Sequence, residues 1–389
     1  MKTTQRFLAF LAVLAAPLWV SSAAQTPDRL TGKKHEYLAF VGTYTTKTTS
    51  KGIYAFRYDA KAGKLTPIGV AAETQDPSFV VAHPSGKYLY AVNEAGKSSM
   101  VSAFALDAHG GTLTLLNQLP ALGEDPCYIS LDRSGKYILV ANYTSGNIVV
   151  FPILADGKLG EHTALVQNAG TLGPNKERQE GPHAHWIETT PDNRFVLSVD
   201  LGIDEVLIYK FDASKGTLGP SDPAFVKLAG GTGPRHLTIA PNKKFAYSVD
   251  ELNSTVTVFS FDAGKAALTA LQTISTLPQG TTGRNDTAEI AVHPSGKFLY
   301  ASNRGHDTIA LFHVDAASGK LTAGGEFSIE GKEPRNFAID PSGDFLLAAD
   351  QLSDKIVIFR INPATGELTA TGQSVEVPSP VDIAFVTAK

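Results

Sequence analysis

The feature that most constrains this 389-residue chain is an internal repeat with a period of about 50 residues. Segments such as "PSFVVAHPSGKYLYAVNE" and "PRNFAIDPSGDFLLAADQ" consist of two short apolar runs separated by a turn. A third apolar run follows, such as "VSAFALD" or "TVTVFSFD", and then a segment resembling Gly-Lys-Leu-Thr. Six such units begin at Pro77, Pro126, Pro182, Pro234, Thr287 and Pro334. Self-similarity of this kind indicates a repeat architecture.

Each unit is predicted to form four short strands. In "HPSGK", proline presets φ and glycine supplies a positive φ, so the pentapeptide is a tight turn between the first two strands. Long amphipathic helical patterns are absent, and Gly, Pro, Asn and Asp separate the apolar runs. Four-stranded units at this period are typical of β-propeller blades rather than helical solenoids.

The two ends of the chain complement each other. Residues 380–386, "PVDIAFV", read as a first strand without a second, and residues 37–45, "YLAFVGTYT", read as a second strand without a first. Joined, they complete a seventh blade, and this closure removes exposed sheet edges. The sequence therefore predicts an all-β fold, a seven-bladed propeller in a single domain over residues 37–389. A β-sandwich does not explain six similar units plus two complementary halves.

The N-terminal residues have the pattern of a secretory signal. Lys2 and Arg6 precede the apolar run "FLAFLAVLAAPLWV", and the small residues "SSAA" follow it. We expect cleavage after Ala24, leaving residues 25–36 as an extension and a periplasmic or secreted protein. The apolar run is short for a membrane anchor, and no cysteine follows it as in a lipoprotein.

Charge and cysteine content narrow the partners and the chemistry. The net charge is −4 and becomes more negative after cleavage, which argues against nucleic acid or an anionic membrane surface as a partner. Cys127 is the only cysteine, so an internal disulfide and a thiolate metal cluster are excluded. We expect Cys127 to be an inert core residue.

Propeller geometry predicts where functional residues lie. The first strand of each blade lines the central channel and the second runs antiparallel to it, so the start of the first and the end of the second meet at one rim. The residues after the opening of each first strand form one ring: Ser78, Cys127, His183, Arg235, Ala288, Arg335 and Val381. The residues that end the second strands form another: Tyr44, Glu94, Tyr143, Leu201, Glu251, Arg304 and Gln351.

The titratable members of the two rings come from consecutive blades and should share one side of the opening: His183, Arg235, Glu251, Arg304 and Arg335. His185 projects to the same face as His183, one step deeper. The insertion at residues 170–180 should arch over the opening as a lid or a substrate clamp, and it carries Arg178. We expect substrate contacts from His185, Arg335, Arg178, Tyr44 and Gln351.

For several of these residues, a role other than contact with substrate is an alternative. The two histidines could fill the channel, or bind a metal with Glu251, although three nearby arginines would repel a cation. Glu94 is interpreted as a solvated rim acid, and Arg335 could only offset acidic neighbours. His83 and His293 belong to the "HPSGK" turns and are expected to be turn formers. By strand alternation His236 is expected to face away from the channel.

At these residues the chain resembles the seven-bladed β-propeller lactonases, which include 6-phosphogluconolactonase-type enzymes and 3-carboxy-cis,cis-muconate lactonising enzymes. The resemblance covers essentially the whole mature chain. Its most specific segments are "VGTYT" (residues 41–45), "RQEGPHAHW" (178–186), "GTGPRHL" (231–237), "VDE" (249–251) and "GRNDTAEIAVHPSGKFLYASNRGHD" (283–307).

The resemblance implies a metal-free site of one His, one Glu and two Arg in the channel mouth, with no cofactor. The Arg residues fall on Arg235 and Arg304, the Glu on Glu251, and the His on His183 or His185. The repeat register selects the same positions independently. Phosphorylated sugar lactones are made in the cytoplasm, so the export signal leaves the substrate open.

The expected activity is hydrolysis of a sugar-type lactone, the small-molecule partner of a monomeric enzyme. Glu251 or His183 would act as general base toward water, and Arg235 and Arg304 would stabilise the oxyanion and any substrate anion. The sequence contains no Gly-x-Ser-x-Gly elbow, so serine-type acyl-enzyme chemistry is not supported. Two alternatives remain: a cycloisomerase that closes a muconate-type acid, and a non-catalytic binding propeller.

Overall fold

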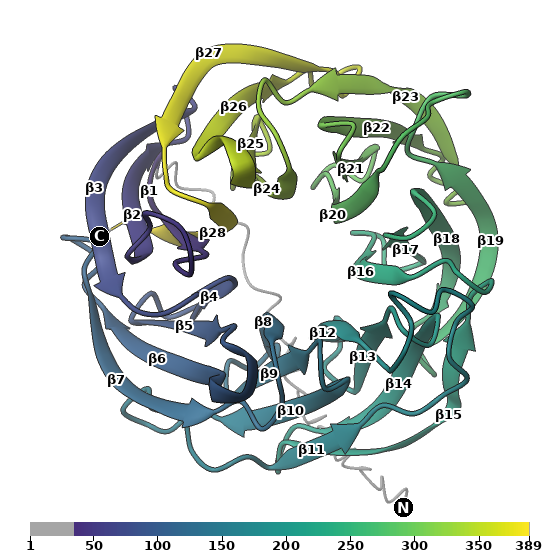
Figure 1. Ribbon diagram of the computed structural model, residues 1–389, viewed down its shortest axis with the longest axis horizontal. Coiled ribbons are helices and arrows are strands. Elements are labelled where there is room, and N and C mark those ends of the chain that lie inside the picture. Colours follow the sequence, from purple (N-terminus) through teal and green to yellow (C-terminus); the bar gives the residue numbers. More distant parts are fainter. Residues whose placement is uncertain (1–34, 389) are drawn as a thin grey trace, which may run out of the picture. The chain divides into compact units, whose positions relative to one another are not determined.

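The computed structural model describes residues 35–388, which form seven four-stranded antiparallel sheets around a central channel (Figure 1). The predicted signal sequence and most of the extension, at residues 1–34, lie outside the described residues. Within residues 35–388 no helix is long and apolar enough to cross a membrane. The predicted all-β propeller with seven blades is confirmed.

The strands follow the repeat. The first blade contains β28 (Pro380–Thr387), β1 (Glu36–Thr43), β2 (Gly52–Asp59) and β3 (Lys64–Glu73). The second contains β4 (Val80–Ala82), β5 (Tyr88–Asn93), β6 (Met100–Leu106) and β7 (Leu113–Pro120), with the short 3₁₀ helix η1 (Gly96–Ser98). The third contains β8 (Pro126–Leu131), β9 (Tyr137–Asn142), β10 (Asn147–Pro152) and β11 (Ala164–Gln167). The fourth contains β12 (Ala184–Thr189), β13 (Phe195–Asp200), β14 (Glu205–Asp212) and β15 (Thr217–Lys227).

The remaining three blades repeat this arrangement. The fifth contains β16 (Pro234–Ile239), β17 (Phe245–Asp250), β18 (Thr255–Asp262) and β19 (Ala267–Ser275). The sixth contains β20 (Asp286–Val292), β21 (Phe298–Arg304), β22 (Thr308–Val314) and β23 (Leu321–Ser328). The seventh contains β24 (Pro334–Ile339), β25 (Phe345–Asp350), β26 (Lys355–Ile361) and β27 (Leu368–Glu376), with the 3₁₀ helix η2 (Gln351–Ser353).

The ring closes as the complementary ends predict. β28 pairs antiparallel with β1, with Leu38 opposite Val386 and Phe40 opposite Ala384. The N-terminal strand is therefore held in its blade by the C-terminal strand, and the channel wall has no unpaired strand at this point.

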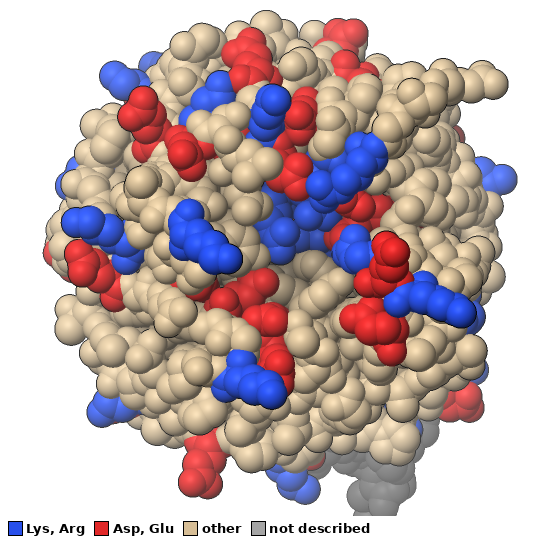
Figure 2. Space-filling model, in the orientation of Figure 1, with Lys and Arg blue, Asp and Glu red and all other residues tan. Residues whose placement is uncertain are grey.

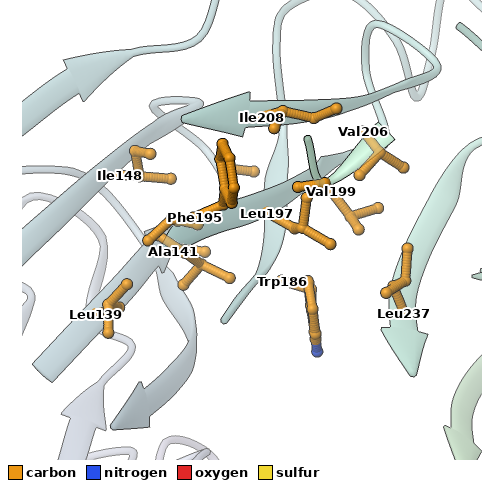
Figure 3. Close-up of a cluster of buried hydrophobic side chains, with 14 of the residues drawn as sticks. Leu139, Ala141, Ile148, Trp186, Phe195, Leu197, Val199, Val206, Ile208 and Leu237 are labelled. Atoms are coloured by element: carbon orange, nitrogen blue, oxygen red, sulfur yellow. The ribbon is translucent and has the colours of Figure 1, made fainter. Parts of the chain in front are cut away.

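The blades are held together by apolar side chains between neighbouring sheets (Figure 3). Ile148 of β10, Leu197 of β13 and Leu237 of β16 belong to one buried cluster, although they come from three successive blades. Full burial of such a side chain contributes about 1.5–3 kcal/mol, so the stacked sheet faces supply most of the driving force for closing the ring.

The "HPSGK" histidines build turns and also join blades. In the turn after β4, His83 Nδ1 accepts a hydrogen bond from the backbone of Ser85, and Gly86 has a positive φ of 65°. His83 Nε2 bonds the carbonyl oxygen of Gly135 in the next blade at 2.9 Å. His293 repeats the arrangement with a 2.8 Å bond to Gly343. The predicted role of both histidines as turn formers is confirmed.

A β-bulge at the start of the first strand recurs in several blades and determines which residues face the channel. In the fifth blade Pro234 pairs with Asp250 and His236 with Val249, so Arg235 is the extra residue. The same irregularity occurs at Cys127, His185 and Arg335. Because a bulge interrupts alternation, Arg235 and His236 both line the channel. The prediction that His236 faces away from it is wrong.

The bulge also corrects the position of His183. Ala184 pairs with Asp200 as Pro234 pairs with Asp250, so His185, and not His183, is equivalent to Arg235. The expectation that His183 belongs to the ring of residues opening the first strands is therefore wrong. The misalignment arose because "GPHAH" places its proline two residues earlier than the other units do.

Candidate active site

A cavity of about 180 Å³ lies at the rim where first strands begin and second strands end. It is lined by Glu94, Cys127, Tyr143, Arg178, His185, Glu251, Arg304 and Arg335. Figure 2 shows Lys and Arg atoms gathered in the central opening, with acidic side chains beside them. Five of the nine residues proposed from the sequence line this cavity: Glu251, Arg304, His185, Arg335 and Arg178.

Glu251 is buried at the centre of a cluster of three arginines. Its Oε2 atom lies 3.0 Å from Arg235 Nε and 2.8 Å from Arg304 Nη2, and its Oε1 atom accepts a hydrogen bond from Arg178. Burial alone would raise the pKa of Glu251, but the charges of Arg304, Arg235 and Arg178 outweigh this effect and lower the pKa to about 2. Glu251 is therefore a fixed anion that positions three cations.

Arg235 lies behind the cavity wall and completes this cluster. Its Nη1 atom donates to the carbonyl oxygen of Ala288 at 2.7 Å. Burial and the charges of Arg304 and Arg335 lower the pKa of Arg235 to about 10, which still leaves the guanidinium protonated at neutral pH. Arg304 is held similarly, with Nη2 donating to the carbonyl oxygen of Thr287 at 3.2 Å. These backbone contacts fix the direction of each guanidinium.

The insertion at residues 170–180 is anchored through Gln179 and places Arg178 in the cavity wall. Gln179 is buried, and its Nε2 atom donates to Leu201 O at 2.9 Å and to Asp204 Oδ1 at 2.8 Å. The neighbouring Arg178 also lies 3.8 Å from Asp286 Oδ1. The insertion thus supplies one of the three cations around Glu251.

The two histidines have different surroundings. His183 is outside the set of cavity-lining residues: its ring stacks on Tyr143 with centroids 4.5 Å apart, and Nδ1 donates to the carbonyl oxygen of Tyr143 at 3.0 Å. His185 lines the cavity, with Nδ1 3.5 Å from Cys127 Sγ. Burial and the charge of Arg235 lower the pKa of His185 well below its usual value, so it is neutral at physiological pH.

Tyr44 and Arg335 form the opposite part of the site. The Arg335 guanidinium lies over the Tyr44 ring, 5.3 Å from its centroid. Within residues 35–388 no carboxylate forms an ion pair with Arg335. Burial alone would lower the pKa of Arg335, but Tyr44 and the charges of Glu94 and Glu251 outweigh this effect and raise it, so Arg335 does offset acidic neighbours at longer range. Gln351 lies with Tyr44 in an adjoining groove of about 540 Å³ and does not line the cavity around Glu251.

Sequence reasoning did not assign a role to Glu94 or Tyr143, although both were placed in the ring that ends the second strands. Glu94 lines the cavity and its Oε2 accepts a hydrogen bond from Tyr44 Oη at 2.7 Å. It is half-buried, so it keeps partial access to solvent, and its interpretation as a solvated rim acid stays a prediction. Glu94 occupies the register position of Glu251 in another blade, and that equivalence is the signal that could have identified it.

The cavity offers no clear metal site. Among residues 35–388 no group of three or more His, Cys, Asp or Glu side chains is arranged to hold a metal ion. The ligand-binding potential of the cavity comes instead from guanidinium groups, which suit carboxylate, phosphate and carbonyl oxygens through their fixed, paired donors.

Cys127 is expected to be unreactive in the native protein even though it lines the cavity near His185. Burial raises the pKa of the thiol, and the pKa of His185 is lowered, so both shifts oppose a thiolate–imidazolium pair. We expect iodoacetamide at neutral pH to leave the native protein unmodified, as measured by intact mass, and to add one group after denaturation in guanidinium chloride. Stoichiometric alkylation of the native protein would contradict this description of the thiol.

Comparison with known proteins agrees with the fold. The family model "Lactonase, 7-bladed beta-propeller" matches residues 38–385. A 6-phosphogluconolactonase of Bacillus subtilis is 36% identical over 302 residues, covering 78% of this chain and 84% of the relative.

Two solved structures are similar over nearly the whole propeller. A putative 6-phosphogluconolactonase from Bacteroides fragilis has a TM-score of 0.85 and 38% identity, covering 92% of this chain and 99% of that one. The periplasmic gluconolactonase of Pseudomonas aeruginosa also has a TM-score of 0.85, with 35% identity, covering 91% of this chain and 100% of that one. The chain therefore belongs to the seven-bladed β-propeller lactonase family and is an enzyme of the lactonase class.

Proposed function

We propose that this enzyme hydrolyses a sugar-type lactone, a gluconolactone or its 6-phosphate, by metal-free catalysis in the periplasm or outside the cell. The observation that carries the proposal is a single cavity lined by Arg178, Arg304 and Arg335 together with the fixed anion Glu251, which Arg178 and Arg304 contact. The names of the Bacillus subtilis and Pseudomonas aeruginosa relatives support the substrate class. The export pattern of residues 1–24 and the periplasmic relative support the location.

The arginines can stabilise the negative charge that develops during lactone opening and can bind an anionic group of the substrate. When water attacks the carbonyl carbon, negative charge develops on the carbonyl oxygen, and guanidinium donors that are already oriented stabilise it without reorganising. Arg304 and Arg335 face the cavity and can reach a bound carbonyl oxygen or a substrate anion. Arg235 and Arg178 act mainly by holding Glu251, and through it the position of Arg304.

Two earlier candidates for the general base fit this geometry poorly. Glu251 has a pKa of about 2 and both of its oxygens face guanidinium groups, so it has little tendency to accept a proton from water. His183 stacks behind Tyr143 and does not line the cavity. In this proposal Glu251 positions the arginines, and His185 is a neutral wall residue that can contact substrate.

A pH-stat assay tests the function directly. Purified protein lacking residues 1–24 is given 6-phosphoglucono-1,5-lactone, glucono-1,5-lactone or an aromatic-derived muconolactone, and acid release is compared with the spontaneous rate. We expect acceleration for at least one of the two sugar lactones. Activity confined to the muconolactone would instead support a cycloisomerase acting in reverse, and no acceleration for any of the three would contradict the proposal.

A further inference from the structure

We propose that Glu94 is the general base that activates water in this cavity, with Tyr44 as its positioning residue. This inference rests on the proposed lactone hydrolysis and names the one step that the arginine cluster cannot perform. The cavity is lined by two carboxylates, Glu94 and Glu251, and within residues 35–388 only Glu251 forms ion pairs.

The hydrogen bonds of Glu94 leave one oxygen available to water. Its Oε2 atom accepts from Tyr44 Oη at 2.7 Å, and within residues 35–388 no protein donor contacts its Oε1 atom. The side chain is half-buried and lines the cavity, so this oxygen can reach solvent and substrate. A base needs such access, together with a fixed position relative to the proton that it removes.

Tyr44 supplies the fixed position. Burial raises the pKa of the Tyr44 phenol well above its usual value, so the hydroxyl stays protonated and donates to Glu94. The backbone on both sides is also pinned: Tyr44 N donates to Ser379 O at 3.2 Å, and Glu94 N donates to Asp76 O at 3.0 Å. Asp76 in turn accepts a 2.6 Å bond from the backbone of Thr45, the residue after Tyr44.

The arrangement of blades places the base opposite the main cationic cluster. Glu94 follows β5 in the second blade, whereas Glu251 follows β17 in the fifth, and Figure 1 shows these strands on opposite sides of the channel. Arg335 connects the two sides, since it lines the cavity and stacks on Tyr44. A lactone bound between them would have its carbonyl oxygen near guanidinium groups and its carbonyl carbon accessible to a water molecule next to Glu94.

The proposed step balances without a cofactor. Glu94 takes a proton from water as the oxygen of that water bonds to the carbonyl carbon, and the arginines hold the resulting oxyanion. The ring carbon–oxygen bond then breaks, and Glu94 returns the proton to the departing ring oxygen. The product is a hydroxy acid, whose ionisation releases the proton that a pH-stat measures, and Glu94 regains its initial charge.

The test compares Glu94→Gln with Glu73→Gln, which removes the same charge from an exposed residue of β3 outside the cavity. On the sugar lactone that the wild type turns over best, we expect E94Q to lower kcat by about 10²–10⁴-fold, with KM changed much less, because the arginines still bind substrate. E73Q should retain wild-type kcat. Thermal unfolding of both variants shows whether each is folded.

Chemical rescue separates a base from a structural role. In Glu94→Ala, added formate should restore part of the lost kcat, because a small carboxylate can occupy the vacated space, and formate should leave E73Q unchanged. Loss of the Tyr44 hydroxyl in Tyr44→Phe should lower kcat by about fivefold, the value of one hydrogen bond. A wild-type enzyme without lactone turnover would overturn the proposed function as well. An active wild type whose E94Q variant retains kcat would overturn only the assignment of Glu94.

Discussion

Replacement of Glu251 by glutamine is expected to lower the free energy of unfolding by about 3 kcal/mol or more at neutral pH, because it leaves three guanidinium groups around a buried neutral amide. The same change should reduce kcat/KM by at least about 100-fold, since the oxyanion donors lose their fixed positions. Thermal unfolding and the pH-stat assay measure the two effects. The matched control is Glu205→Gln, which removes a buried carboxylate paired with a single cation, Lys227, at 3.3 Å.

The pKa of Glu251 determines how the stability difference between the wild type and E251Q changes with pH. The pKa of Glu251 is about 2 in the folded protein and 4.5 for an unperturbed glutamate, so its contribution to stability is complete above pH 4.5. It is lost as the pH falls from 4.5 toward 2. The difference in Tm between the wild type and E251Q should therefore be largest at neutral pH and should narrow below pH 4.5. A constant difference across this range would contradict the assigned ion cluster.

Inorganic phosphate provides a second readout for the same variant. With Glu251 neutralised, the arginine cluster lacks its internal anion, and a bound phosphate can take its place. We expect phosphate to raise the Tm of E251Q more than that of the wild type, because at a given concentration a ligand that binds the folded state more tightly stabilises it more. Equal stabilisation of the two proteins would show that the cluster does not accept an external anion.

Replacement of Arg335 by methionine should distinguish a phosphorylated from an unphosphorylated substrate. Arg335 lines the cavity, and in the described part of the chain no carboxylate pairs with it, so it is the guanidinium best placed to bind a substrate anion. One charge-assisted hydrogen bond contributes about 1.5–3 kcal/mol, so kcat/KM for 6-phosphogluconolactone should fall by about 10–100-fold. Turnover of glucono-1,5-lactone should change little if Arg335 binds the phosphate.

Two further variants control for this effect. Arg284→Met removes the same charge from an exposed residue near the mouth, where Arg284 pairs with Asp286 at 2.6 Å, and it should change kcat/KM far less. Arg335→Lys retains the charge but not the paired donors, and should lie between the wild type and R335M. Equal losses on both lactones in R335M would instead assign Arg335 to the carbonyl oxygen that the two substrates share.

The sequence predicted more of the fold than of the site. The repeat and the complementary ends predicted seven blades and ring closure, because strand-length apolar runs with turn residues between them can be read locally. The same register identified Glu251 and Arg304 at the ends of second strands, whose pairing with the third strands is regular up to Asp250 and Asn303. No local pattern indicates the β-bulges of the first strands, so the expected orientation of His236 is wrong. The expected position of His183 is wrong because its proline lies two residues earlier than in the other units, whereas His185 lines the cavity as expected.

The sequence by itself determined the architecture of this protein, since the periodic burial of apolar runs permits little besides a closed ring of sheets. Only the tertiary structure decided the chemistry of the opening. It showed that Glu251 is surrounded by three arginines, while the one side-chain hydrogen bond that the Glu94 carboxylate accepts within residues 35–388 comes from the Tyr44 hydroxyl. The two carboxylates occupy equivalent positions in their repeats, so their difference arises from neighbouring blades. Contacts between residues 73 positions apart in the chain, such as Arg178 and Glu251, depend on how the whole ring closes.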